Sequence, residues 1–119
     1  MPHHSVTRLR LRSLFTLPAF MREVGAINAQ AAAAPGFMDG AVLAEGRLVF
    51  WTRTAWESAE AMAAFRDSGA HSASMPKLTQ WCDEASVLHW QGEACADWDA
   101  IHARMVGEGR ASRVQRPSR

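Results

Sequence analysis

His71 is the side chain in this sequence best suited to proton chemistry. It follows Gly69-Ala70, at the joint between two segments with helical patterns. Histidine titrates near neutral pH, so its imidazole can act as a general acid or base, or as the axial ligand of a haem. The alternative is a histidine at a helix end whose ring is hydrogen-bonded to a backbone carbonyl. Both roles stay open here, and His71 is the candidate catalytic residue.

Three arginines, Arg8, Arg10 and Arg12, alternate along the first predicted strand and so project from one face. Like charges in a row are unfavourable unless they meet acidic groups, aromatic rings or an anionic ligand. They form either an anion-binding patch or a subunit interface, in which they pair with carboxylates or stack on indoles. We favour the interface, and we add Trp51 and Arg53 because a suitable strand register would place them on the same face.

Cys82, Asp83, Glu84 and His89 lie close together in the sequence, which invites a metal hypothesis. They show no CxxC, HxxxH or HExxH spacing, so no metal is predicted. The sequence also lacks a P-loop, a GxGxxG fingerprint, a nucleophile elbow and the spacing of a catalytic triad. This argues against nucleotide-dependent and serine-hydrolase chemistry.

The composition narrows the class of protein further. The formal net charge is +1, so no nucleic-acid partner is predicted. Cys82 and Cys95 show no pairing or ligand pattern, which favours a reducing, cytoplasmic location. The polar start of the chain does not resemble a signal peptide, and no segment approaches the roughly 20 apolar residues of a membrane helix.

The elements that would position these residues follow from periodicity. Alternation or continuous apolar character predicts strands over residues 5–14, 37–44, 47–55 and 85–91. Apolar residues at steps of three and four predict a helix from Thr16 to Ala34, and further helices start near Ser58 and Ser74. The order β-α-β-β-α-β is that of a ferredoxin-like α+β domain, with a four-stranded antiparallel sheet covered by helices on one face.

We expect a single domain over residues 1–106, with an extra C-terminal helix capped by Asp97. Residues 107–119 contain four arginines and one large aliphatic side chain, which predicts a disordered tail. The strand over residues 47–55 is apolar on both faces, because Val49 and Trp51 oppose Leu48 and Phe50. Helices can cover only one of these faces, so we expect a second subunit to cover the other and predict a homodimer.

The segment FWTRTAWESAEAMAAFRDSGAHSASMPKL resembles the central motif of the antibiotic-biosynthesis-monooxygenase-like group, part of the dimeric α+β-barrel superfamily. The shared features are an apolar strand, Trp56, a polar cap, the helix start Glu60-Ala61-Met62, and His71 after the helix. Pro35-Gly36-Phe37 also resembles the start of the second strand in that group, and the resemblance covers roughly residues 6–90. It implies a homodimer whose sheets pack face to face, with a pocket in each subunit between sheet and helices.

The resemblance also carries expectations about the site. In cofactor-independent members, an asparagine near the end of the third strand and a tryptophan after it line the pocket. Trp56 matches the tryptophan, whereas Thr52 stands where the asparagine would be expected. The haem-degrading branch has a pocket asparagine on the first strand, and residues 6–13 contain none.

The sequence therefore predicts a small-molecule-binding protein, in particular a cofactor-independent monooxygenase acting on a hydrophobic aromatic substrate with His71 moving the proton. At helical spacing, core packing is the better explanation for most of the methionines and tryptophans. The candidates for the pocket wall are Thr52, Trp56, Phe65, Met75 and Trp81. The alternatives are a haem-binding protein with His71 as axial ligand, and a non-catalytic binding or interaction module.

Overall fold

The computed structural model describes residues 2–94 and 97–111 of the chain. Its antiparallel sheet consists of β1 (His3–Leu11), β2 (Phe37–Glu45), β3 (Val49–Trp56), β4 (Cys82–Gln91) and the two-residue β5 (Arg110–Ala111). The strand order is β2-β3-β1-β4-β5. The predicted ferredoxin-like arrangement is confirmed, and β5 adds a short edge strand to the four predicted ones.

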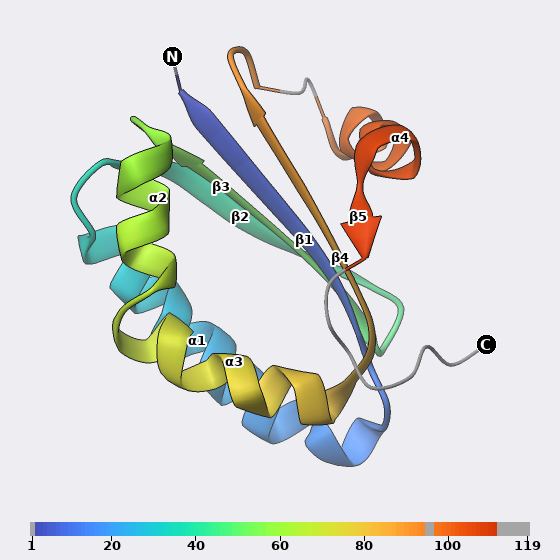
Figure 1. Ribbon diagram of the computed structural model, residues 1–119. Helices are drawn as coiled ribbons and strands as arrows, with labels where there is room; N and C mark the ends of the chain where they lie inside the picture. Colours follow the sequence, from blue (N-terminus) through green and yellow to red (C-terminus); the bar gives the residue numbers. More distant parts are fainter. Residues whose placement is uncertain (1, 95–96, 112–119) are drawn as a thin grey trace.

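The helices lie on both faces of this sheet (Figure 1). A 3-10 turn, η1 (Leu14–Thr16), leads into α1 (Leu17–Ala33), which packs on one face together with α2 (Ala59–Arg66) and α3 (Gly69–Trp81). The last helix, α4 (Trp98–Glu108), lies on the opposite face. None of the described helices is both long and apolar enough to cross a membrane.

Local sequence signals explain where two of these helices begin. The hydroxyl of Ser58 accepts a hydrogen bond from the N–H of Ala61 at 3.1 Å, and a carboxylate oxygen of Asp97 accepts one from the N–H of Ala100 at 2.9 Å. Each side chain thus satisfies a backbone donor that the first turn leaves unpaired. The predicted caps of α2 and α4 are confirmed.

One predicted helix start is confirmed and one is wrong. Thr16 directly precedes α1 and Pro18 lies in the first turn, as predicted, although the Thr16 side chain makes no cap hydrogen bond. Just before it, the Ser13 hydroxyl accepts a hydrogen bond from the N–H of Phe15 at 3.1 Å and so caps η1. The helix expected from Ser74 begins at Gly69, which places Pro76 inside α3 rather than in its first turn. Gly69 can open this helix because its φ of 58° is readily accessible only to glycine.

The sheet face under α1, α2 and α3, called the inner face here, carries two apolar clusters. One contains Leu11, Phe20, Phe50 and Cys82. The other contains Ala31, Trp56, Met62 and Phe65. They lie toward opposite ends of β3, because Phe50 is near its start and Trp56 is its last residue.

The opposite face, called the outer face here, is covered largely by α4 of the same chain. Trp51 is only 4 % exposed and stacks on His102 of α4, with ring centroids 4.0 Å apart. Val6, Leu88, Trp90, Ile101 and Met105 complete this cluster. The sequence-based argument for a dimer assumed that Trp51 stays uncovered within one chain. That premise is wrong, because the apolar stripe of α4 packs on it.

The C-terminal boundary also differs from the predicted one. The helix α4 continues to Glu108, and Met105 near its end is buried. Beyond it, Arg110 and Ala111 pair with Val87 and Ser86 of β4. Secondary structure therefore continues past residue 106 to at least Ala111, and residues 112–119 of the predicted tail lie outside the described residues.

Candidate functional site

A cavity of about 200 Å³ lies between the inner face of the sheet and the three helices that cover it. Its floor is formed by inward-facing side chains of β1, β3 and β4, and its roof by α1, α2 and the start of α3. Most of its lining is apolar. A concave, largely apolar site with a few polar groups is the usual form of a small-molecule site.

Strand pairing arranges the floor of this cavity in three rows across β3, β1 and β4. The first row is Phe50, Leu9 and Ala85; the second is Thr52, Thr7 and Val87; the third is Thr54, Ser5 and His89. The rows therefore change from fully apolar to fully polar over four residues of each strand.

His71 lines the cavity from the first turn of α3. Its Nδ1 is 3.0 Å from the carbonyl oxygen of Arg66, and its ring packs on Phe65 with centroids 5.0 Å apart. A carbonyl oxygen only accepts hydrogen bonds, so Nδ1 carries the proton and Nε2 of the neutral ring carries the lone pair. Burial lowers the pKa of His71, opposed by the hydrogen bond to Arg66. The neutral form is therefore favoured at pH 7.

Gln30 of α1 holds the joint that presents His71. Its side-chain nitrogen donates to the carbonyl oxygens of Phe65 at 3.0 Å and Ser68 at 2.8 Å. Its side-chain oxygen accepts from the N–H of His71 at 2.8 Å. A Cβ at Gly69 would lie only 3.0 Å from this amide, so glycine is needed for both backbone angle and space. Gln30 was not predicted as a site residue. The only sign of its role in the sequence is a polar side chain beside the apolar stripe, three residues after Ile27.

The predicted pocket residues fall into different places. Thr52 and Phe65 line the cavity with His71. Trp56 is fully buried against Phe65, with ring centroids 4.9 Å apart, and lies outside the described lining. Trp81 is half-buried against the cluster of Leu11 and Phe20 and also lies outside it. Met75 belongs to α3, but its side chain lies outside the described residues.

Arg8 and Arg10 of the predicted arginine group lie on the outer face, away from the cavity. An Arg8 nitrogen is 3.6 Å from Glu84, and Arg10 forms ion pairs with Glu84 and, at 3.4 Å, with Asp83. These carboxylates belong to the adjacent strand β4 of the same chain. The charge row is thus compensated within one subunit.

The other members of that group are also engaged within the chain. Arg12 donates to the carbonyl oxygen of Gln80 at 3.0 Å, and Arg53 pairs with Asp39 at 3.1 Å. Trp51 donates to a carboxylate oxygen of Glu45 at 3.3 Å beneath α4.

The metal hypothesis and the Cys82 thiol can each be compared with the structure. Across residues 2–94 and 97–111, no cluster of three or more His, Cys, Asp or Glu side chains is arranged to hold a metal ion. Burial raises the pKa of the Cys82 thiol to about 11, so the nucleophilic thiolate is scarce at neutral pH.

Comparison with known proteins gives a fold and no family assignment. No protein-family model matches the chain, and no curated protein does. Many solved structures share the fold. The chain thus has the ferredoxin-like α+β fold found in antibiotic-biosynthesis-monooxygenase-like structures, as the sequence resemblance implied.

Three of these structures show the range of proteins with this fold. SnoaB of Streptomyces nogalater, a cofactor-independent oxygenase, is 13 % identical with a TM-score of 0.67, over 80 % of this chain and 96 % of its own. Rv0793 of Mycobacterium tuberculosis is 13 % identical with a TM-score of 0.72, over 82 % and 100 %. A Nitrosomonas europaea protein assigned as an antibiotic biosynthesis monooxygenase is 15 % identical with a TM-score of 0.70, over 76 % and 89 %.

Proposed function

We propose that this chain binds a small hydrophobic, oxidisable aromatic molecule in the cavity and oxygenates it without a cofactor. The observation that carries the proposal is the state of His71. Its ring lines an apolar cavity, its proton is held on Nδ1 by the Arg66 carbonyl, and burial favours the neutral form. Nε2 is then a base at neutral pH, as proton abstraction from a phenolic or enolic substrate requires.

The proposed chemistry balances without an external reductant. Nε2 of His71 takes the O–H proton of a hydroxyaromatic, and the electron pair stays on the substrate as a phenolate. The phenolate passes an electron to O₂, and the two radicals combine to form a C–O bond at the para carbon. Loss of the para hydrogen and cleavage of the O–O bond give a quinone and water. The substrate supplies all four electrons, and one oxygen atom enters each product.

The protein would contribute three things to this reaction: desolvation of the phenolate, orientation of its ring, and the proton-transfer group. SnoaB, a cofactor-independent oxygenase with the same fold, supports the feasibility of such chemistry on this scaffold. The position corresponding to the family asparagine is Thr52, which lines the cavity.

Haem fits this cavity poorly. Its volume of about 200 Å³ is below the roughly 300–1,000 Å³ of pockets that hold drug-sized ligands. A porphyrin is larger than most of those ligands. His71 as an axial ligand is therefore not supported by the dimensions of the site.

The replacement His71→Asn tests the proposal. The asparagine amide can still donate to the Arg66 carbonyl, but it offers no base. With 1-naphthol as the probe substrate, an oxygen electrode should record turnover lower by about 10²- to 10⁴-fold, while the melting temperature stays within a few degrees. His102→Asn on α4, outside the cavity, is the matched control and should keep wild-type turnover.

Two results would count against an oxygenase. Equal turnover in His71→Asn and wild type would remove His71 from the chemistry. Binding of 1-naphthol without any oxygen uptake by the wild type would favour a non-catalytic binding module, the second candidate, which needs only the cavity.

A further inference from the structure

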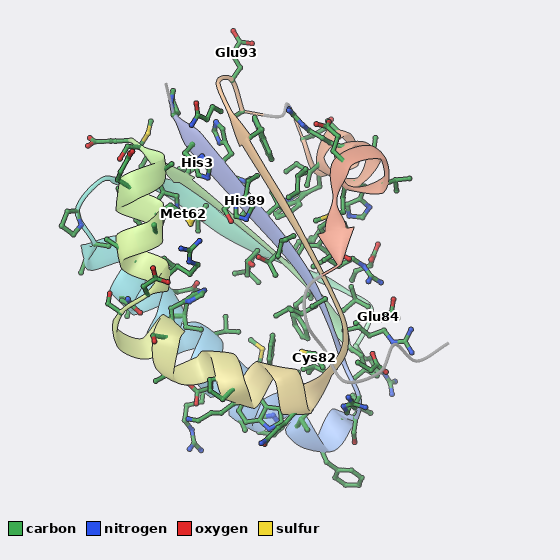
Figure 2. The ribbon with its side chains drawn as sticks, in the orientation of Figure 1. His3, Met62, Cys82, Glu84, His89 and Glu93 are labelled. Atoms are coloured by element: carbon green, nitrogen blue, oxygen red, sulfur yellow. The ribbon has the colours of Figure 1, made fainter. Side chains whose placement is uncertain are left out.

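The cavity has two chemically different ends. At one end, the row of Phe50, Leu9 and Ala85 faces Phe20 and Val24 of α1. Glu23 also lines the cavity from α1, and its carboxylate forms an ion pair with Lys77. At the other end lies the row of Thr54, Ser5 and His89, and Figure 2 shows His89 on the side of the sheet that faces Met62 of α2. His89 is exposed, so the polar end opens to solvent and the apolar end lies deeper.

His71 belongs to the polar end. Its ring packs on Phe65, and Phe65 packs on Trp56 at 4.9 Å between centroids. Trp56 follows Thr54 by two residues on β3, and Thr54 is paired with Ser5. The base and the polar row therefore lie at the same end of the cavity.

Behind this end lies a buried polar side chain whose hydrogen-bonding capacity is unused. His3 of β1 stacks on His89 at 5.6 Å between centroids and is 8 % exposed. Figure 2 shows both side chains at the end of the sheet that faces Met62 of α2. Within the described part of the chain, neither ring nitrogen of His3 has a hydrogen-bond partner, nor does the indole N–H of the adjacent Trp56. Buried polar groups are nearly always paired with protein, water or a ligand.

The size of the cavity limits what can bind between these ends. An engineered protein cavity of about 150 Å³ holds one benzene molecule. A cavity of about 200 Å³ therefore suits one or two fused rings.

We propose that the cavity selects one- or two-ring hydroxyaromatics, whose ring lies on Leu9, Phe50 and Ala85 and whose oxygen is bound by Ser5, Thr54 and His89. This inference rests on the proposed function for the role of His71 and adds the class, size and orientation of its substrate. Hydroxyl and imidazole groups both donate and accept hydrogen bonds, so they fit a phenolic O–H before and after it loses its proton. His3 lies behind His89, where it can support the imidazole or a bound water.

Equilibrium dialysis of three probes tests this without any catalytic step. 1-Naphthol should bind the full chain about tenfold more tightly than naphthalene, as expected for one or two good hydrogen bonds. The four-ring 1-hydroxypyrene should bind at least tenfold more weakly than 1-naphthol. Ser5→Ala and Thr54→Val should each reduce the preference for 1-naphthol over naphthalene by several-fold. Two variants are used because either of them could fail to fold, and the other would still test the proposal.

A matched variant at the apolar end separates orientation from general affinity. Leu9→Ala should weaken 1-naphthol and naphthalene by the same factor, and Val106→Ser on the exposed side of α4 should change neither. Equal affinity of the wild type for 1-naphthol and naphthalene overturns the proposal. So does an unchanged preference in folded Ser5→Ala or Thr54→Val, tight binding of hydroxypyrene, or no binding of any probe. Selective binding without oxygen uptake would instead keep this inference and refute the oxygenase.

Discussion

Replacing Ile101 by alanine tests whether α4 covers the outer face of the sheet within one chain. Ile101 is 2 % exposed and packs in one cluster with Val6, Trp51 and Leu88. Truncating a buried isoleucine to alanine costs about 2–5 kcal/mol, because apolar contacts are lost and a cavity remains. A domain of ordinary stability has only about 5–15 kcal/mol in total. The melting temperature should therefore fall by roughly 10 °C or more.

Circular dichroism melts at two protein concentrations measure this effect. Val106→Ala on the same helix is the control, since Val106 is 91 % exposed and its truncation should cost less than about 0.5 kcal/mol. If Ile101→Ala melts with the wild type, α4 does not pack on the sheet. If Ile101→Ala and wild type melt together at low protein concentration and differ only at high concentration, where subunits associate, α4 packs on a partner subunit instead, which also refutes the reasoning.

Three further predictions concern the whole chain. Burial lowers the pKa of both His3 and His71 below 6.5, so the unfolded chain binds more protons in acid than the folded chain does. The free energy of unfolding should therefore fall as the pH drops below about 6.5. Urea titrations at pH 7.5 and 5.5 should show this fall, and it should be smaller in His71→Asn. Truncation after Ala111 should leave the melting temperature within a few degrees, whereas truncation after Ala94 removes α4 and should abolish cooperative unfolding. The homodimer implied by the sequence resemblance should give twice the 13.1 kDa of one chain in light scattering, and a mass near 13 kDa would refute it.

The order of the elements was accessible from the sequence because each carries its own period. The alternation around Val6 and the apolar steps from Phe20 to Ala31 are local patterns, and the caps at Ser58 and Asp97 are local signals. The packing of α4 on the outer face could not be predicted from local patterns in the same way. Both the stripe ending at Met105 and the apolar outer face were visible, but their contact depends on how the chain folds back after β4.

The candidate site was predicted only in part, for the same reason. His71 was recognised from its place between two helical segments. Its hydrogen bond to Gln30 joins residues 41 positions apart, and no local pattern encodes such a partner. The polar row of Ser5, Thr54 and His89 depends on the pairing register of three strands. The register depends on which face of each strand is buried. The sequence did not show that α4 covers the outer face, so the register and the polar row could not be predicted.

Because the strand register depends on which face is buried, α4 influences the side chains that line the cavity although α4 itself does not line it. Along β1, Ser5, Thr7 and Leu9 face the cavity, while Val6, Arg8 and Arg10 face outward. A register slip of one residue would turn the arginines into the cavity and the hydroxyls outward. Val6 in the cluster under α4, and the ion pairs of Arg8 and Arg10 with Asp83 and Glu84, both oppose such a slip. The outer face therefore helps determine which side chains a ligand meets on the inner one.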